Sequence, residues 1–239
     1  MLEIRALDVD IQGSRILSRI DIDVAPNEFV CLIGRNGAGK STTFRAIMGQ
    51  RKPVAGRVTF KGQDLSRLST YQIARLGIGY APEESEVFTD LTVAENIEMP
   101  TWVTGNRSTR TAAQRIATAY EMFPKLIDYR ERGGGQLSGG ERKMLSIARA
   151  LVLDPDLLLL DEPFEGLSPV VIPQIADGLA AIRNSGRAIL VAESQFHHVP
   201  EFTDRLYVIE RGEIVFQGTT AQAERDAATM KILRGTDGT

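Results

Sequence analysis

Apolar residues follow three patterns along the chain, and each pattern predicts a different kind of element. Between residues 2 and 24 apolar and polar positions alternate, which is typical of strands with one exposed face and favours an antiparallel sheet. Helical patterns elsewhere end at glycine, at Gly49 and Gly186. Other runs are apolar at every position, as in parallel strands covered on both faces: Phe29–Ile33, Ile78–Ala81, Leu157–Leu160 and Ala188–Ala192. This alternation predicts an α/β fold with a mainly parallel central sheet and an N-terminal antiparallel β subdomain.

The alternation of strands and helices breaks between residues 91 and 132, where the sequence is helix-like up to a run of glycines that begins at Gly133. We therefore expect a helical subdomain, at about residues 88–150, inserted into the α/β core. Near the C-terminus two strand-like runs flank Arg211 and Gly212, a two-residue spacer suited to a tight hairpin. With 239 residues and no internal repeat, the chain is expected to form one domain, residues 1–239.

Composition and charge limit the classes of partner. The hydrophobic fraction of 43% is enough to bury a substantial core, and a net charge of −3 with scattered Lys and Arg argues against nucleic acid as a partner. The single cysteine, Cys31, lies in an apolar run and is expected to be a buried, inert thiol in a reducing compartment. No leader pattern begins the chain, and no apolar run approaches the roughly 20 residues of a membrane-spanning helix. Work at a membrane would therefore need partners.

A phosphate-binding loop follows the first buried strand and precedes an amphipathic helix, in the context that the motif G-x-x-x-x-G-K-[ST] requires. Its glycines let backbone N–H groups surround phosphate oxygens, with help from the helix N-terminus. We expect Lys40 to reach the β and γ phosphates, Ser41 to bind Mg²⁺ and Thr42 to reach the α phosphate. The motif reads Gly34, Arg35, Asn36, Gly37, Ala38, Gly39, Lys40, Ser41.

Two carboxylates end the buried strand at residues 157–160, and open α/β sheets bind ligands outside the carboxyl ends of their strands. Asp161 is a candidate for holding Mg²⁺ through water. Glu162 is a candidate general base that accepts a proton from the attacking water or orients it. A solvated acidic turn would be the alternative if no phosphate loop preceded these residues.

A second glycine-rich segment, Ser138-Gly139-Gly140-Glu141, precedes a helix with an apolar face. Locally it predicts a capping box, in which Ser138 and Glu141 bond to each other's backbone. Two glycines in the first turn of a helix each weaken it by roughly 1 kcal/mol. They therefore indicate a surface that a second phosphate group approaches closely.

These motifs resemble those of the nucleotide-binding subunits of ATP-binding-cassette (ABC) transporters, whose LSGG(Q/E) signature also lies just before the acidic strand. The resemblance covers essentially the full length. It implies a P-loop NTPase (RecA-like) core, ATP and Mg²⁺ as cofactors, and hydrolysis of ATP to ADP and phosphate. Segments 79–83, 91–96 and 165–169 are similar to the branched-chain amino-acid uptake branch of the family.

The resemblance also implies roles for residues outside the phosphate loop. Two subunits of that family pair head to tail, so Ser138, Gly139, Gly140 and Glu141 would bind the ATP of the second cassette. Glu83 occupies the glutamine-loop position, which links Mg²⁺ and the attacking water to the permease contact. A plain surface glutamate is the alternative for Glu83.

The chain departs from the family pattern at two places. Where members usually stack adenine on an aromatic residue, this chain has Ile11, so apolar contact from Ile16 is the substitute we expect. Such stacking is worth about 1 to 3 kcal/mol by analogy with base stacking. Where most members place a γ-phosphate histidine, this chain has Ser194. We do not transfer that role to His197 or His198, which are more simply surface or helix-face residues.

The resemblance implies an ATP-hydrolysing subunit of an ABC importer for branched-chain or other amino acids. The expected partners are a second cassette, of the same chain or a paralogue, the transmembrane permease and, indirectly, a solute-binding protein. The expected location is peripheral, on the cytoplasmic face of the cell membrane. An ABC motor for another cargo or for export, and a soluble ABC ATPase without a transport role, are the alternatives. The cargo is chosen by the permease and cannot be read from this chain.

Overall fold

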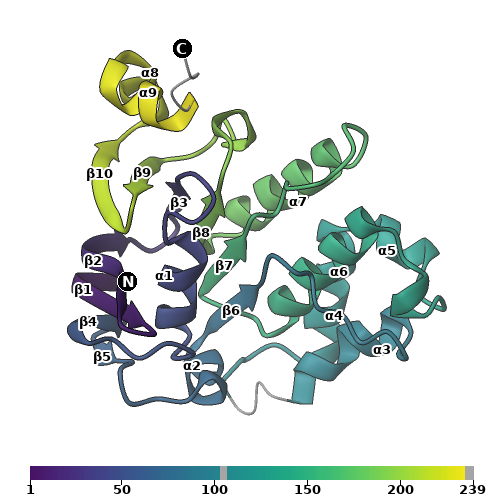
Figure 1. The fold of residues 1–239 in the computed structure, drawn as a ribbon. Coiled ribbons are helices and arrows are strands. Elements are labelled where there is room, and N and C mark those ends of the chain that lie inside the picture. Colours follow the sequence, from purple (N-terminus) through teal and green to yellow (C-terminus); the bar gives the residue numbers. More distant parts are fainter. Residues whose placement is uncertain (103–106, 235–239) are drawn as a thin grey trace. The chain divides into compact units, whose positions relative to one another are not determined.

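The computed structural model describes residues 1–102 and 107–234, and the chain divides into two compact units. The first unit combines Met1–Ile73 with Ala188–Thr239, and the second is Ala74–Arg187 (Figure 1). Each unit has its own buried strands. The expected insertion at about 88–150 falls within the second unit, and its residues 103–106 lie outside the described part of the chain.

An antiparallel sheet forms the beginning of the first unit, in the order β2-β1-β4-β5. Its bounds are β1 Leu2–Ile11, β2 Ser14–Val24, β4 Ala55–Phe60 and β5 Gln63–Asp64. Leu2 and Ile4 of β1 face Val24 and Ile22 of β2, and all four side chains are fully buried. The alternation of apolar and polar residues thus places one face of the sheet in a core, and the predicted antiparallel sheet is confirmed.

The first unit also contains the strand that carries the phosphate loop. β3 (Phe29–Ile33) pairs in parallel with β8 (Ala188–Glu193) on one side and β9 (Arg205–Glu210) on the other. β9 returns as β10 (Glu213–Gly218) through Arg211 at φ 49° and Gly212 at φ 81°. Two consecutive positive φ angles are typical of a type I′ turn, so the predicted hairpin is confirmed.

Short helices complete the first unit. They are α1 (Lys40–Ile47), the 3₁₀ turn η3 (Phe196–His198), α8 (Thr220–Arg225) and α9 (Ala227–Arg234). Gly49, just past α1, has φ 68°, the left-handed conformation expected at a helix end. Cys31 belongs to a buried apolar cluster with Ile33 and Ala223, and burial raises the pKa of its thiol well above the ordinary value. The prediction of a buried cysteine is confirmed.

The second unit contains the strand that ends at Asp161 and a group of helices. β6 (Ile78–Ala81) and β7 (Leu157–Asp161) pair in parallel, with Ile78 opposite Leu157. The helical elements of the inserted subdomain are α3 (Val93–Glu98), η1 (Met99–Trp102), α4 (Ala112–Met122), α5 (Lys125–Asp128), η2 (Gly134–Gln136) and α6 (Gly139–Val152). The helix α6 packs against α3 and α4. The helical insertion and the α/β fold class are both confirmed.

Two further helices border the insertion, α2 (Thr70–Leu76) before β6 and α7 (Ile172–Asn184) after β7. Gly186, beyond α7, has φ 81° and ends the helix as predicted. Along residues 1–102 and 107–234, no helix has both the length and the apolar character needed to span a membrane.

Candidate functional site

The loop between β3 and α1 has the backbone that a phosphate cradle needs. Gly37 and Gly39 have φ angles of 82° and 114°, which L side chains rarely adopt. A Cβ on Gly34 would meet the carbonyl oxygen of Ile209 at 2.3 Å, and one on Gly39 would meet Leu17 at 2.6 Å. These glycines are therefore required by conformation and by close approach, and the loop leads directly into the N-terminus of α1.

The ammonium of Lys40 lies folded back over this loop. Lys40 is only 4% exposed, and its Nζ donates to Gly34 O at 2.7 Å, Arg35 O at 3.3 Å and Ser194 Oγ at 2.8 Å. A lysine ammonium has three N–H donors, so each of them has an oxygen acceptor in this arrangement. A phosphate that binds Lys40 must replace at least one of these oxygens.

Ser194 lies directly at the phosphate loop, next to the end of β8. Its hydroxyl donates to Asn36 Oδ1 at 2.5 Å while it accepts from Lys40. The two histidines that follow are arranged differently, because His198 Nδ1 lies 3.4 Å from the fully buried Glu193 Oε2, and the ring of His197 contacts that of His198. The structure therefore brings Ser194 to Lys40 and pairs His198 with a carboxylate in the fold.

The remaining candidates of the first unit lie close to the same loop. Ser41 and Thr42 are half-buried in the first turn of α1. The carbonyl oxygen of Ile16 would lie 3.5 Å from a Cβ at Gly39 and 2.1 Å from one at Gly212. The backbone of Ile16 therefore runs beside the phosphate loop, which is where an apolar contact to a bound base is expected.

The acidic pair stands at the carboxyl end of β7. Asp161 is 2% exposed and accepts a hydrogen bond from Tyr80 Oη at 3.3 Å. Glu162 is 3% exposed and has φ 49°, an uncommon conformation for this residue that costs on the order of 1 to 3 kcal/mol. Backbone strain of this kind concentrates at functional sites. The positive φ angle of Glu162 turns the chain where the strand ends, immediately after Asp161.

The signature segment forms the predicted capping box. Ser138 Oγ accepts from Glu141 N at 3.3 Å, and Glu141 Oε2 accepts from Ser138 N at 2.8 Å. Burial alone would raise the pKa of Glu141, but the hydrogen bonds from Ser138 outweigh it and lower that pKa. Ser138 and Glu141 therefore each have a structural task at the start of α6.

The two glycines of the signature differ in their surroundings. A Cβ on Gly140 would meet Val171 Cγ1 at 2.7 Å, so packing alone requires glycine there. A Cβ on Gly139 would meet nothing within 4 Å, and Gly139 has no positive φ. Neither packing nor backbone conformation therefore requires glycine at position 139, whereas packing does at position 140.

Glu83 and Gly139 of the signature line one hollow of about 270 Å³ in the second unit. The loop 83–85 forms one wall, Gly139 and Lys143 of α6 form a second, and residues 165–167 form a third. The side chain of Glu83 is exposed, while its carbonyl oxygen accepts from Lys143 Nζ at 2.7 Å. The structure therefore ties the Glu83 loop to the helix that carries the signature.

The donor set suits Mg²⁺ in one respect. Ser41 and Asp161 offer hard oxygen ligands, which Mg²⁺ prefers, and this ion usually keeps several waters and binds substrate phosphates. Over residues 1–102 and 107–234, no three or more His, Cys, Asp or Glu side chains gather into a metal site. The hydroxyl of Ser41 and the carboxylate of Asp161 each fit Mg²⁺ by their chemistry.

Three residues of these sites were not predicted from the sequence: Tyr80, Asn36 as the partner of Ser194, and Lys143. Tyr80 lies in the segment 79–83 that resembles the uptake branch, and a hydroxyl near the end of an otherwise apolar strand is itself a signal. Lys143 interrupts the apolar face of α6 and is 5% exposed. A buried cation of this kind requires an acceptor, but its sequence position does not tell which one.

Comparisons with known proteins agree with this geometry. A family model described as ABC transporter matches residues 17–165. The lipopolysaccharide export system ATP-binding protein LptB of Haemophilus influenzae is 34% identical over 94% of this chain and 92% of its own length. The high-affinity branched-chain amino acid transport ATP-binding protein BraG of Pseudomonas aeruginosa is 37% identical over 86% of this chain and 87% of its own length. The crystal structure of the ADP conformation of MJ1267, an ATP-binding cassette of an ABC transporter, has a TM-score of 0.83 at 26% identity and covers 98% of each chain.

Proposed function

The chain belongs to the ABC transporter family of ATP-binding subunits, whose members hydrolyse ATP, and we propose that it drives an importer for branched-chain or other amino acids. The observation that carries the ATPase part is the phosphate loop with Lys40 folded over it, in a chain whose strand β7 ends at Asp161, directly before Glu162. The amino-acid part is supported by the likeness to BraG.

The phosphate loop binds the nucleotide in this proposal. The left-handed Gly37 and Gly39 turn backbone N–H groups toward the phosphates, and Lys40 exchanges one of its present oxygen acceptors for a phosphate oxygen. Thr42 binds the α phosphate and Ile16 contacts the adenine. We assign Ser41, Asp161 and Glu83 to hold Mg²⁺, directly or through water, and the ion would neutralise phosphate charge when bound.

Glu162 is the general base of the proposed reaction. It accepts a proton from the water that attacks the γ phosphate, and its strained backbone orients the carboxylate. Tyr80 keeps Asp161 oriented through its hydrogen bond at 3.3 Å. Because Ser194 can donate one hydrogen bond but cannot become cationic near neutral pH, this chain's own site is slower than one with histidine there.

The signature acts on the ATP of a second cassette. Two cassettes pair head to tail, so that the open surface at Gly139, with Ser138, Gly140 and Glu141, faces the partner's nucleotide. The absence of any neighbour within 4 Å of a Cβ at Gly139 supports this role. The partner cassette is either a second copy of this chain or a paralogue.

The loop that begins at Glu83 is the proposed permease contact. Asn96, which is fully buried, holds both the N–H and the carbonyl of Phe88 at 2.9 Å. The guanidinium of Arg149 lies 4.6 Å from the centre of the Phe88 ring, yet Phe88 is 44% exposed. An aromatic side chain presented on a clamped backbone suits an interface anchor, because little freedom is lost on binding. The chain would then lie on the cytoplasmic face of the membrane, with a solute-binding protein acting through the permease.

Export is the second candidate function, because LptB is about as similar as BraG. To decide between them, the tagged chain is purified from detergent-solubilised membranes and its partners are identified by mass spectrometry. Import predicts a permease whose reconstituted complex hydrolyses ATP faster when a solute-binding protein loaded with a branched-chain amino acid is added. Stimulation by lipopolysaccharide instead would favour export. Phe88→Ala should reduce recovery of the permease, whereas Tyr71→Ala, at an exposed aromatic of the first unit, should not.

A further inference from the structure

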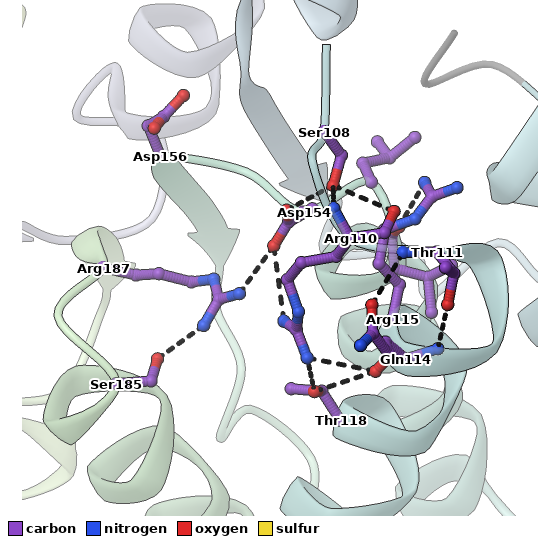
Figure 2. A network of polar contacts seen from close by, with 12 residues as sticks. Ser108, Arg110, Thr111, Gln114, Arg115, Thr118, Asp154, Asp156, Ser185 and Arg187 are labelled. Atoms are coloured by element: carbon purple, nitrogen blue, oxygen red, sulfur yellow. Dashed lines mark hydrogen bonds and ion pairs between the residues drawn. The ribbon is translucent and has the colours of Figure 1, made fainter. Parts of the chain in front are cut away.

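A cluster of charged residues surrounds the short turn between α6 and β7. This turn, residues 153–156, joins the helix that begins with the signature to the strand that ends at Asp161. Asp154 lies in the turn at φ 54°. Arg107, Arg110 and Arg187 contact this turn from the loop before α4 and from the segment after α7, and Arg115 of α4 contacts the last residue of α6. Figure 2 shows Arg110, Arg115 and Arg187 around Asp154.

Asp154 is the centre of this cluster. Its carboxylate accepts from Ser108 Oγ at 2.7 Å and from Arg187 Nη2 at 2.7 Å, and it lies 3.5 Å from Arg110 Nη1 (Figure 2). The side chain is only 16% exposed. Burial would raise the pKa of Asp154, but Ser108 and the arginines outweigh it and lower the pKa. The carboxylate therefore stays ionised and joins three segments that are distant in the sequence.

Two of the arginines cap the C-terminal end of α6. Arg115 Nη1 donates to Val152 O at 3.2 Å, and Arg107 Nη2 donates to Leu153 O at 2.7 Å and also to Asp154 O. The last carbonyls of a helix have no partner within the helix and carry partial negative charge, so guanidinium groups stabilise them. Arg107 also pairs with Asp156 at 3.0 Å. Arg107 thus contacts both the end of α6 and Asp156, the residue directly before β7.

We propose that Asp154 is a positioning residue that fixes α6 against β7, and so sets the signature relative to Asp161 and Glu162. The 14 residues of α6 span about 21 Å from the signature to this turn. A packed helix transmits a displacement at one end to the other. Asp154, at the opposite end of α6 from the signature, therefore controls how the two motifs are positioned. The functional part of this inference rests on the proposed roles of the signature and Glu162.

Asp154→Asn is the decisive variant, because asparagine keeps the size of the side chain and tolerates positive φ, so that only the charge is lost. We expect the melting temperature to fall by about 4 to 8 °C. Hydrogen exchange should become faster at residues 108–118 and 150–156. The matched control is Asp128→Asn, at an exposed aspartate of the same unit, which should change neither.

The functional readouts are taken at 15 °C, where the variant is folded by circular dichroism. Asp154→Asn should lower kcat about tenfold while leaving KM for ATP and the affinity for ADP within twofold. A residue that only stabilised the unit would lower the melting temperature and leave kcat unchanged, and that outcome overturns the proposal. If Asp154→Asn does not fold, Arg110→Met removes the longest contact of Asp154 and should show the same pattern in weaker form.

Two measurements separate this proposal from the proposed function. Double-mutant analysis of Asp154→Asn with Arg187→Met should give a combined shift in melting temperature smaller than the sum of the single shifts, whether or not the chain hydrolyses ATP. Because the folded-state pKa of Asp154 is lowered, its contribution is present above its unfolded pKa and is lost as pH falls through the folded pKa. Wild type should therefore lose stability more steeply than Asp154→Asn below about pH 4. The proposal is overturned if the shifts in melting temperature are additive and if wild type and Asp154→Asn lose stability equally steeply at low pH, even if ATPase activity is normal.

Discussion

Lys40→Met tests the physical basis of nucleotide binding in this chain. Methionine keeps most of the length and the apolar stem of lysine but removes the ammonium, which now bonds to Gly34 O, Arg35 O and Ser194 Oγ. Because Lys40 is 4% exposed, its contact with phosphate forms out of water, where a hydrogen bond to a charged group contributes about 1.5 to 3 kcal/mol. The oxygen that phosphate displaces reduces the gain, so we expect the lower half of this range.

The expected loss of about 1.5 to 2 kcal/mol corresponds to roughly 10- to 30-fold weaker ATP binding. Isothermal titration with ATP measures it directly, and circular dichroism checks that the variant is folded. The matched control is Lys61→Met, at an exposed lysine of the same unit, which should bind ATP as wild type does. A dissociation constant for Lys40→Met within threefold of wild type would refute the reasoning.

Further variants address the other motifs. Glu162→Gln should slow hydrolysis by about 100-fold or more while ATP still binds and traps a dimer visible by size-exclusion chromatography; undiminished turnover would overturn the assignment. Ser194→His should raise turnover of this chain's own site about tenfold in a steady-state ATPase assay, and no rise would show that the site is not slow for want of a histidine. Gly140→Ala should lower stability by about 1 to 3 kcal/mol through overlap with Val171. Gly139→Ala should leave the urea midpoint unchanged but weaken ATP-driven dimerisation; equal effects of the two alanines on stability would contradict the distinction between these glycines.

Local patterns in the sequence predicted the parts of the fold that depend on local physics. Buried strands such as β3 and β8 are apolar at every position, and the turn at Arg211 and Gly212 needs two positive φ angles that short-range sequence reveals. The phosphate loop was predictable for the same reason, because its glycines and lysine are adjacent in the chain. The prediction that residues 1–239 act as a single domain stays a prediction.

The contacts that join distant residues could not be predicted in this way. Ser194 and Lys40 are 154 positions apart, and only the folded structure shows that the serine hydroxyl bonds to the lysine of the phosphate loop. Asp154 reads as an ordinary residue of a polar turn, although its carboxylate binds Arg187 and Ser108. Gly139 and Gly140 look equivalent in the sequence, and only the position of Val171 separates a packing requirement from an open surface.

Single-turnover phosphate release tests most directly whether the chain hydrolyses ATP with Lys40 and Glu162 in their proposed roles. Enzyme in excess over ATP is mixed with Mg²⁺, alone and together with any cassette or permease that co-purifies, so that even a slow site converts its substrate. We expect release of the γ phosphate by wild type, with a rate constant at least about 100-fold lower for Glu162→Gln. No release by wild type in either form, or equal rates for wild type and Glu162→Gln, would contradict it.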